Sequence, residues 1–156
     1  MGKSSVKNFI LLIDDEKVIR EIGQEMIELL GYKCIIAKDG EEGVELFRKN
    51  SEKILIVVLD VEMPGISGEI VSNIISEEVP DTRILFISGY DRNYLEKKVF
   101  KKEIKNFMPK PLSVKSLSRK FNEMLRENVI RKLFCPDLLR SAEGRSSGIS
   151  KTGDMP

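Results

Sequence analysis

ILIVVLDVEMPGISG, residues 54–68, is the stretch that decides the fold class of this chain. Its first six residues are apolar and rich in β-branched side chains, which is typical of a strand buried on both faces of a parallel sheet. Pro64, Gly65 and Gly68 then interrupt regular structure. Asp60 therefore lies at the carboxyl end of the predicted strand, which is the edge where open α/β sheets bind their ligands.

The composition favours one folded domain with an additional segment. The chain has 156 residues, of which 41% are hydrophobic and 33% are charged, and this suits a domain of roughly 120 residues. No apolar run reaches the ~18 residues of a membrane span, and residues 1–8 lack the apolar region of a signal peptide. We therefore predict a cytoplasmic protein without membrane contact.

The net charge and the absence of histidine limit the classes of function that this chain can have. The formal net charge of +1 does not favour a general nucleic-acid-binding surface. The chain contains no histidine, so an imidazole base, an imidazole metal ligand and a phosphohistidine within these residues are all excluded.

Short apolar runs alternate with amphipathic segments along the chain. Apolar residues at spacings of three and four predict the helices, including one from Arg92 to about Glu103 and a last one that Ser113 caps. The short connections predict parallel strands with right-handed crossovers, and hence a doubly wound α/β sheet. Besides the strand that ends at Asp60, the predicted strands are Phe9–Ile13, Lys33–Ala37, Arg83–Ile87 and Asn106–Met108.

The predicted domain organisation has three parts. Residues 1–8 form an N-terminal tail, residues 9–127 form the folded domain, and residues 128–156 form a helix extension followed by a disordered tail. Disorder is expected from Ser141 to Pro156, because this segment is rich in Ser and Gly and has few large apolar residues.

Polar side chains follow four of the predicted strands, and parallel strand ends share one edge. Three carboxylates at that edge repel one another unless a cation neutralises them, and an all-oxygen set suits a hard ion such as Mg²⁺. A lysine and a serine hydroxyl can hold phosphoryl oxygens, which leaves one aspartate to attack phosphorus and form an acyl phosphate. The residues concerned are Asp14, Asp15, Asp60, Ser88 and Lys110.

Each of these residues also has an ordinary structural interpretation. Asp14 and Asp15 are suited to capping the helix that follows them, and Asp60 is suited to a turn. Ser88 alone is a loop hydroxyl, and Lys110 alone is a surface lysine. Their common position at strand ends on one edge favours the chemical interpretation.

Four pieces of the sequence resemble the response-regulator receiver domains of two-component signalling. They are FILLIDDE, VVLDVEMPGISG, ILFISGY and FMPKPL, in the family's order and at similar separations. The resemblance covers Phe9 to Glu127. It implies a stand-alone receiver with a flavodoxin-like (βα)5 sheet of strand order 2-1-3-4-5, which acts as a signalling protein and not as an enzyme.

The resemblance also implies roles for the acidic residues. Asp60 would be the phosphoacceptor. Asp15 and Asp60 would be direct ligands of Mg²⁺, with the backbone carbonyl of Glu62 as the third protein ligand and Asp14 acting through a water.

The remaining implied roles belong to the switch and the phosphate site. Ser88 would be the switch hydroxyl, Phe107 the switch aromatic, and Lys110 the phosphate-binding lysine before a cis bond to Pro111. The sequence departs from the family at two places. The segment Lys101–Lys105 replaces a run of small residues, and Phe107 replaces the more frequent tyrosine.

The implied partners are proteins. Because the chain has no histidine, the phosphodonor would be an external sensor histidine kinase or histidine phosphotransfer protein. A phosphoryl group adds roughly 1.5 to 2 negative charges, which would draw Ser88 inward and let Phe107 rotate. The face formed by the fourth helix, fifth strand and fifth helix would then change.

That face is rich in lysine. From Lys97 to Lys120 there are nine basic residues and one acidic residue, Glu103. We expect an acidic downstream protein partner, with a plain solvated helix as the alternative. Nucleic acid is disfavoured, because the lysines show no interleaved pattern of aromatic residues or arginines. The sequence is compatible with a homodimer that forms on phosphorylation.

Two alternative functions share some of these features. A receiver fold can serve as a constitutive interaction module, although the complete set of acidic, hydroxyl and lysine residues speaks against this. A haloacid-dehalogenase-like phosphatase would use Asp60 as nucleophile and Glu62 as general acid. Against it, the acidic pair lies upstream, no acidic motif follows Lys110, and no cap segment is present.

Overall fold

The computed structural model describes residues 6–134 of the chain. The predicted disordered segment, Ser141 to Pro156, lies outside the described residues. The chain divides into two compact units, residues 1–121 and 122–156, and the sheet and the candidate site belong to the first unit. Within the described part, no helix is both long enough and apolar enough to cross a membrane.

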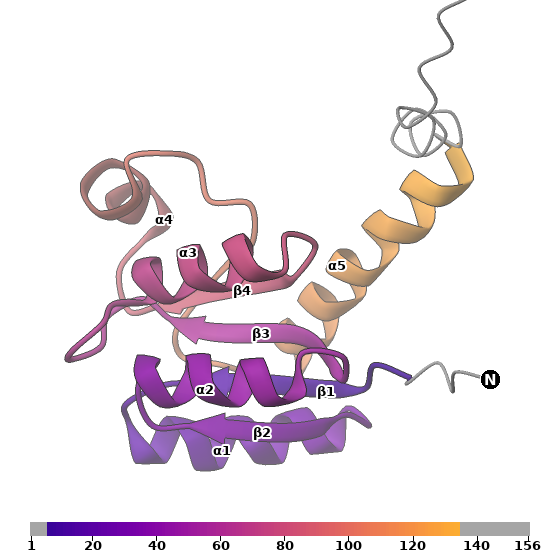
Figure 1. The fold of residues 1–156 in the computed structure, drawn as a ribbon, viewed down its shortest axis with the longest axis horizontal. Coiled ribbons are helices and arrows are strands. Elements are labelled where there is room, and N and C mark those ends of the chain that lie inside the picture. The colour runs from indigo at the N-terminus through magenta and orange to yellow at the C-terminus, as the bar shows by residue number, and fades with distance from the viewer. Residues whose placement is uncertain (1–5, 135–156) are drawn as a thin grey trace, which may run out of the picture. The chain divides into compact units, whose positions relative to one another are not determined.

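Five parallel strands form one sheet in the order β2-β1-β3-β4-β5. Figure 1 shows β2, β1, β3 and β4 side by side in this order. The predicted doubly wound, flavodoxin-like fold is therefore confirmed. The strands are β1 Phe9–Ile13, β2 Lys33–Ala37, β3 Ile54–Asp60, β4 Arg83–Ser88 and β5 Phe107–Pro109.

Helices connect the strands, and side-chain hydrogen bonds cap the N-termini of several of them. The Asp39 carboxylate accepts the backbone N–H of Glu42 at 2.8 Å at the start of α2, and Ser113 accepts that of Ser116 at 3.1 Å before α5. The helices are α1 Lys17–Leu29, α2 Gly40–Asn50, α3 Gly68–Glu78, α4 Arg92–Tyr94 and α5 Val114–Phe134, with a π-helical turn, η1, at Leu95–Phe100.

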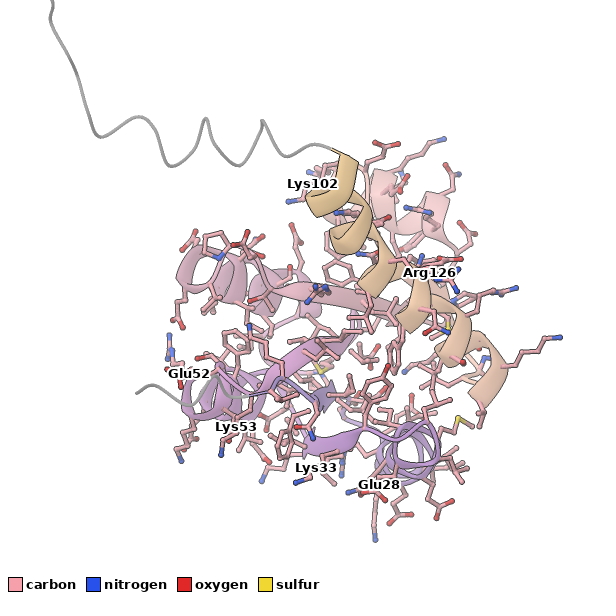
Figure 2. The ribbon with its side chains drawn as sticks, turned by 90° about the vertical axis from the view of Figure 1, so that its right-hand side faces the viewer. Glu28, Lys33, Glu52, Lys53, Lys102 and Arg126 are labelled. Atoms are coloured by element: carbon pink, nitrogen blue, oxygen red, sulfur yellow. The ribbon has the colours of Figure 1, made fainter. Side chains whose placement is uncertain are left out.

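The central strands are buried on both faces, as their continuous apolar runs predict. Successive residues of β1 face opposite layers: a Cβ at Gly23 of α1 would lie 2.6 Å from Leu12, and one at Gly43 of α2 would lie 2.5 Å from Ile13. Charged side chains such as Glu28, Lys33 and Lys102 lie on the outside (Figure 2). Each fully buried Leu or Ile contributes about 1.5–3 kcal/mol to folding.

The fourth helix differs from its predicted extent. The sequence predicts a helix from Arg92 to about Glu103, but α4 ends at Tyr94 and η1 at Phe100, where Lys101 adopts a left-handed φ of 53°. A π-helical turn brings residues five apart onto one side. Leu95 and Phe100 are five apart, and both are buried in one apolar cluster.

Two side chains then hold the segment after η1. The Arg92 guanidinium donates to the carbonyl of Ile104, and its Nε donates to Glu96 at 2.9 Å. The Glu96 carboxylate accepts the backbone N–H of Ile104 at 3.0 Å. This clasp satisfies both backbone groups of Ile104 without helical hydrogen bonds, which explains why the helix stops early.

Strand β5 is also displaced by one residue from its prediction. It begins at Phe107 rather than Asn106 and includes Pro109, which pairs with Ser88. Proline is tolerated there because β5 is the edge strand of the sheet.

Candidate functional site

Asp60 is the last residue of β3, and its side chain is only 1% exposed. The turn after it folds back closely against the strand end, where the backbone N–H of Gly68 donates to Val61 at 3.0 Å. A Cβ at Gly68 would lie 2.3 Å from the carbonyl oxygen of Asp60. Sequence reasoning treated Gly68 only as a breaker of regular structure and missed this close approach.

Three carboxylates meet at this edge of the sheet. Oxygens of Asp14, Asp15 and Asp60 all lie within 4.8 Å of one another. Asp14 is fully buried and Asp15 is exposed. Burial and the nearby Asp14 raise the pKa of Asp60 from its ordinary value of 3.8 to about 7, although Lys110 opposes the shift.

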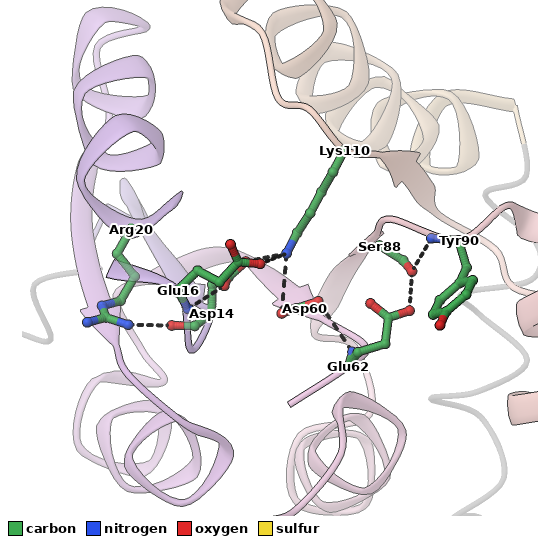
Figure 3. Close-up of polar contacts among 8 residues, drawn as sticks. All are labelled: Asp14, Glu16, Arg20, Asp60, Glu62, Ser88, Tyr90 and Lys110. Carbon is green, nitrogen blue, oxygen red and sulfur yellow. Dashed lines mark hydrogen bonds and ion pairs between the residues drawn. The ribbon is translucent and has the colours of Figure 1, made fainter. Parts of the chain in front are cut away.

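Asp14 is held in place by Glu16, just before α1, and by Arg20 of α1. Its Oδ1 accepts the backbone N–H of Glu16 at 2.9 Å, and its carbonyl accepts Arg20 Nη1 at 2.9 Å (Figure 3). The Asp14 side chain thus holds the turn before α1 and also reaches the acidic cluster. It does not cap the helix, because the N-cap residue of α1 is Glu16 and no side chain accepts a cap hydrogen bond there.

Lys110 brings positive charge into the cluster from the end of β5. Its Nζ lies 2.9 Å from Asp14 Oδ2, 3.3 Å from Asp60 Oδ2 and 3.6 Å from Glu16 Oε1. Burial alone would lower the pKa of Lys110, but the contacts with Asp14 and Asp60 outweigh it and raise that pKa. The peptide bond between Lys110 and Pro111 is cis, as the family resemblance predicts.

Ser88 lies on the other side of Asp60 and is fully buried at the end of β4. Its hydroxyl donates to the carboxylate of Glu62 and accepts the backbone N–H of Tyr90 at 3.0 Å (Figure 3). The backbone N–H of Glu62 in turn donates to Asp60 Oδ1 at 3.3 Å. Sequence reasoning considered the Glu62 side chain only as a general acid and missed its contact with Ser88.

Phe107 lies next to an apolar cluster behind the site. It is partly buried and packs against Val61, Leu95, Phe100 and Ile104. The structure therefore places the predicted switch aromatic beside both β4 and η1. All the predicted site residues except Phe107 lie at the carboxyl edge of the sheet, while Phe107 is the first residue of β5 and pairs with Phe86 of β4.

The acidic cluster has the chemistry that Mg²⁺ requires. The three clustered side chains offer only carboxylate oxygens, which are hard donors. Burial and the neighbouring Asp14 raise the pKa of Asp60, and Lys110 offsets this only in part, so a bound cation would stabilise the ionised form. In addition, the buried Asp14 Oδ2 accepts no hydrogen bond among the described groups. It forms an ion pair with Lys110.

The fold and the acidic cluster are typical of a receiver domain of two-component signalling, and comparison with known proteins agrees. The chain belongs to the response regulator receiver domain family, which matches residues 10–122. Receiver domains bind Mg²⁺ at their acidic pocket, and the cluster of Asp14, Asp15 and Asp60 corresponds to that pocket here. The predicted family and cofactor are thereby confirmed.

Two relatives illustrate the range of proteins that share this domain. A cyclic di-GMP phosphodiesterase from Thermotoga maritima is 28% identical over 145 residues, and the sensor kinase CckA from Brucella abortus is 30% identical over 118 residues. These alignments cover 93% and 76% of this chain. The chain spans only 38% of the phosphodiesterase and 12% of the kinase.

Solved structures of the response regulator TrrA from Thermotoga maritima are also similar. One, in complex with Mg²⁺ and BeF, is 29% identical with a TM-score of 0.67, and covers 75% of this chain and 98% of that one. Another, with the histidine kinase ThkA, is 30% identical with a TM-score of 0.65, and covers 76% of this chain and 98% of that one.

Proposed function

We propose that this chain accepts a phosphoryl group from an external phosphohistidine onto Asp60 and passes the signal to a protein partner. The observation that supports this most directly is the position of Asp60. Asp60 lies close to a second buried carboxylate, Asp14, and the ammonium group of Lys110 contacts both, at 3.3 Å from Asp60 and 2.9 Å from Asp14. The complex of TrrA with a histidine kinase supports a histidine kinase, or a histidine phosphotransfer protein, as the phosphodonor.

In the transfer step, an ionised carboxylate oxygen of Asp60 attacks phosphorus while the phosphorus–nitrogen bond of the donor breaks. The new bond is an acyl phosphate, and the imidazole leaves with a proton from water. Lys110 stabilises charge on the phosphoryl oxygens, since its Nζ already contacts Asp60.

In this proposal Mg²⁺ binds at the acidic cluster. Asp15 and Asp60 would be its direct side-chain ligands, the backbone carbonyl of Glu62 would be the third protein ligand, and Asp14 would act through a water. When bound, the ion neutralises negative charge on the phosphoryl group and the surrounding carboxylates.

The signal leaves through the face that α4, η1, β5 and the start of α5 form. The Ser88 hydroxyl moves towards the new phosphoryl group, and Phe107 rotates towards the space that Ser88 leaves. Lys97, Lys98 and Lys101 are exposed on this face, which favours an acidic protein partner over nucleic acid. In this proposal the chain is a cytoplasmic switch and not an enzyme, and it dimerises only if the altered face pairs with itself.

Titration with beryllofluoride, with and without Mg²⁺, tests this proposal by backbone NMR. We expect Mg²⁺-dependent shifts at Ser88, Phe107 and the lysine-rich face in the native chain, and no such shifts in Asp60→Asn. If the native chain shows no shifts in the presence of Mg²⁺, or if Asp60→Asn responds equally, the proposal is wrong.

A further inference from the structure

The hydroxyl of Ser88 is already fully engaged in this structure. A serine hydroxyl has one hydrogen to donate, and Ser88 donates it to the Glu62 carboxylate. The oxygen also accepts the backbone N–H of Tyr90 at 3.0 Å. Ser88 cannot donate to a phosphoryl group on Asp60 until it leaves Glu62.

Glu62 is well placed to hold Ser88 in this position. It follows Asp60 by two residues, and its backbone N–H donates to Asp60 Oδ1 at 3.3 Å, which ties the turn to the acidic site. Its side chain is exposed, yet it reaches a hydroxyl that is fully buried. A hydrogen bond to a carboxylate is about twice as strong as a neutral one, so this contact is strong enough to matter for the position of Ser88.

We propose that Glu62 is a positioning residue that holds the Ser88 hydroxyl in its resting contact and so opposes activation. The inference rests on the proposed function, because it takes Ser88 as the group that contacts the phosphoryl oxygens. Activation then exchanges one anionic acceptor, the Glu62 carboxylate, for another, the phosphoryl group. The residue at position 62 thereby sets how much of the chain is in the resting state at a given phosphoryl occupancy.

The contact also connects the site with α4. The Tyr90 amide is bonded to Ser88, and the Tyr90 ring stacks on that of Tyr94 with centroids 4.7 Å apart. Tyr94 belongs to the short helix α4. A change in the position of the Ser88 hydroxyl therefore alters the bond to Tyr90, whose amide signal reports the state of Ser88 without any added ligand.

A double-mutant cycle tests the inference with beryllofluoride as the probe. Its dissociation constant is measured in saturating Mg²⁺ for the native chain, Glu62→Ala, Ser88→Ala and the double variant. We expect Glu62→Ala to bind about tenfold tighter than the native chain, which is about 1.4 kcal/mol, and the same change to have less than about a twofold effect in the Ser88→Ala background. Glu77→Ala, which removes an exposed charge from α3, is the matched control and should leave binding unchanged.

An equal gain in both backgrounds would mean that Glu62 acts only through its charge, and it would overturn this inference while leaving the proposed function intact. The absence of any gain would overturn it as well. If the native chain does not bind beryllofluoride at all, the proposed function itself fails, and this inference fails with it.

A second measurement uses the ligand-free chain. We expect the Tyr90 amide resonance to move in Glu62→Ala and to stay close to its native position in Glu62→Gln, because glutamine keeps an acceptor oxygen. An unmoved Tyr90 resonance in a folded Glu62→Ala chain would show that Glu62 does not hold Ser88.

Discussion

Replacing Asp60 by asparagine should stabilise the metal-free chain at alkaline pH. The native carboxyl has its pKa raised to about 7, first by burial and then by Asp14, whereas its ordinary value is 3.8. Between these two values the unfolded chain is ionised at this residue and the folded chain is not. The free energy of unfolding of the native chain therefore falls as pH rises from about 4 to about 7, and the loss is complete above about pH 7.

The size of the effect follows from the shift in pKa. A shift of about three units corresponds to roughly 4 kcal/mol at about 1.36 kcal/mol per unit, which is an upper bound. Asp60→Asn also loses the attraction of Lys110, whose Nζ lies 3.3 Å from Asp60. We therefore expect the variant to be more stable than the native chain by about 2–3 kcal/mol above pH 7, and by much less near pH 5.

Urea denaturation from about pH 5 to about pH 8 without divalent cations measures this difference. Asp81→Asn, at an exposed loop aspartate, is the control and should show no comparable pH-dependent gain. Adding Mg²⁺ at about 100 times its dissociation constant should stabilise the native chain by about 2.7 kcal/mol and narrow the gap. The reasoning is refuted if Asp60→Asn is no more stable than the native chain at alkaline pH, or if the difference does not change with pH.

Three further predictions concern other parts of the fold. Gly68→Ala places a Cβ 2.3 Å from the carbonyl of Asp60, so we expect a loss of about 1–3 kcal/mol of stability and weaker Mg²⁺-dependent beryllofluoride binding; urea denaturation and titration that both match the native chain would contradict this. Arg92→Ala breaks the clasp on Ile104 and should speed amide hydrogen exchange in that segment, whereas unchanged protection would argue against the clasp. Burial, followed by a nearby glutamate, raises the pKa of Cys34 to about 12, so alkylation measured by mass spectrometry at neutral pH should be slow, and a rate like that of a free thiol would disprove it.

The sheet could be predicted because its signals are local. The run that ends at Asp60 is buried along nearly its whole length, and turn residues mark its end, so its type and boundary follow from neighbouring residues alone. The gathering of Asp14, Ser88 and Lys110 around Asp60 follows from one further step, since parallel strands end at a common edge. The strand order came from the family resemblance, and the structure confirms it.

The parts that could not be predicted depend on contacts between distant residues. The early end of the fourth helix depends on Arg92 reaching Ile104, which is 12 residues away along the chain. The bond between Glu62 and Ser88 joins residues 26 apart, and no local pattern marks it. In both cases a side chain satisfies a group on another element, and this is visible only once the fold has brought the two together.

The most direct test of the account is transfer of a phosphoryl group to Asp60. The native chain and Asp60→Asn are incubated with a small acyl-phosphate donor, with and without Mg²⁺, and followed by intact mass and peptide mapping. We predict one phosphoryl adduct on the native chain, dependent on Mg²⁺ and mapped to Asp60, and none on Asp60→Asn. An adduct at another residue, or none on the folded native chain with Mg²⁺ present, would contradict the account and favour a constitutive interaction module.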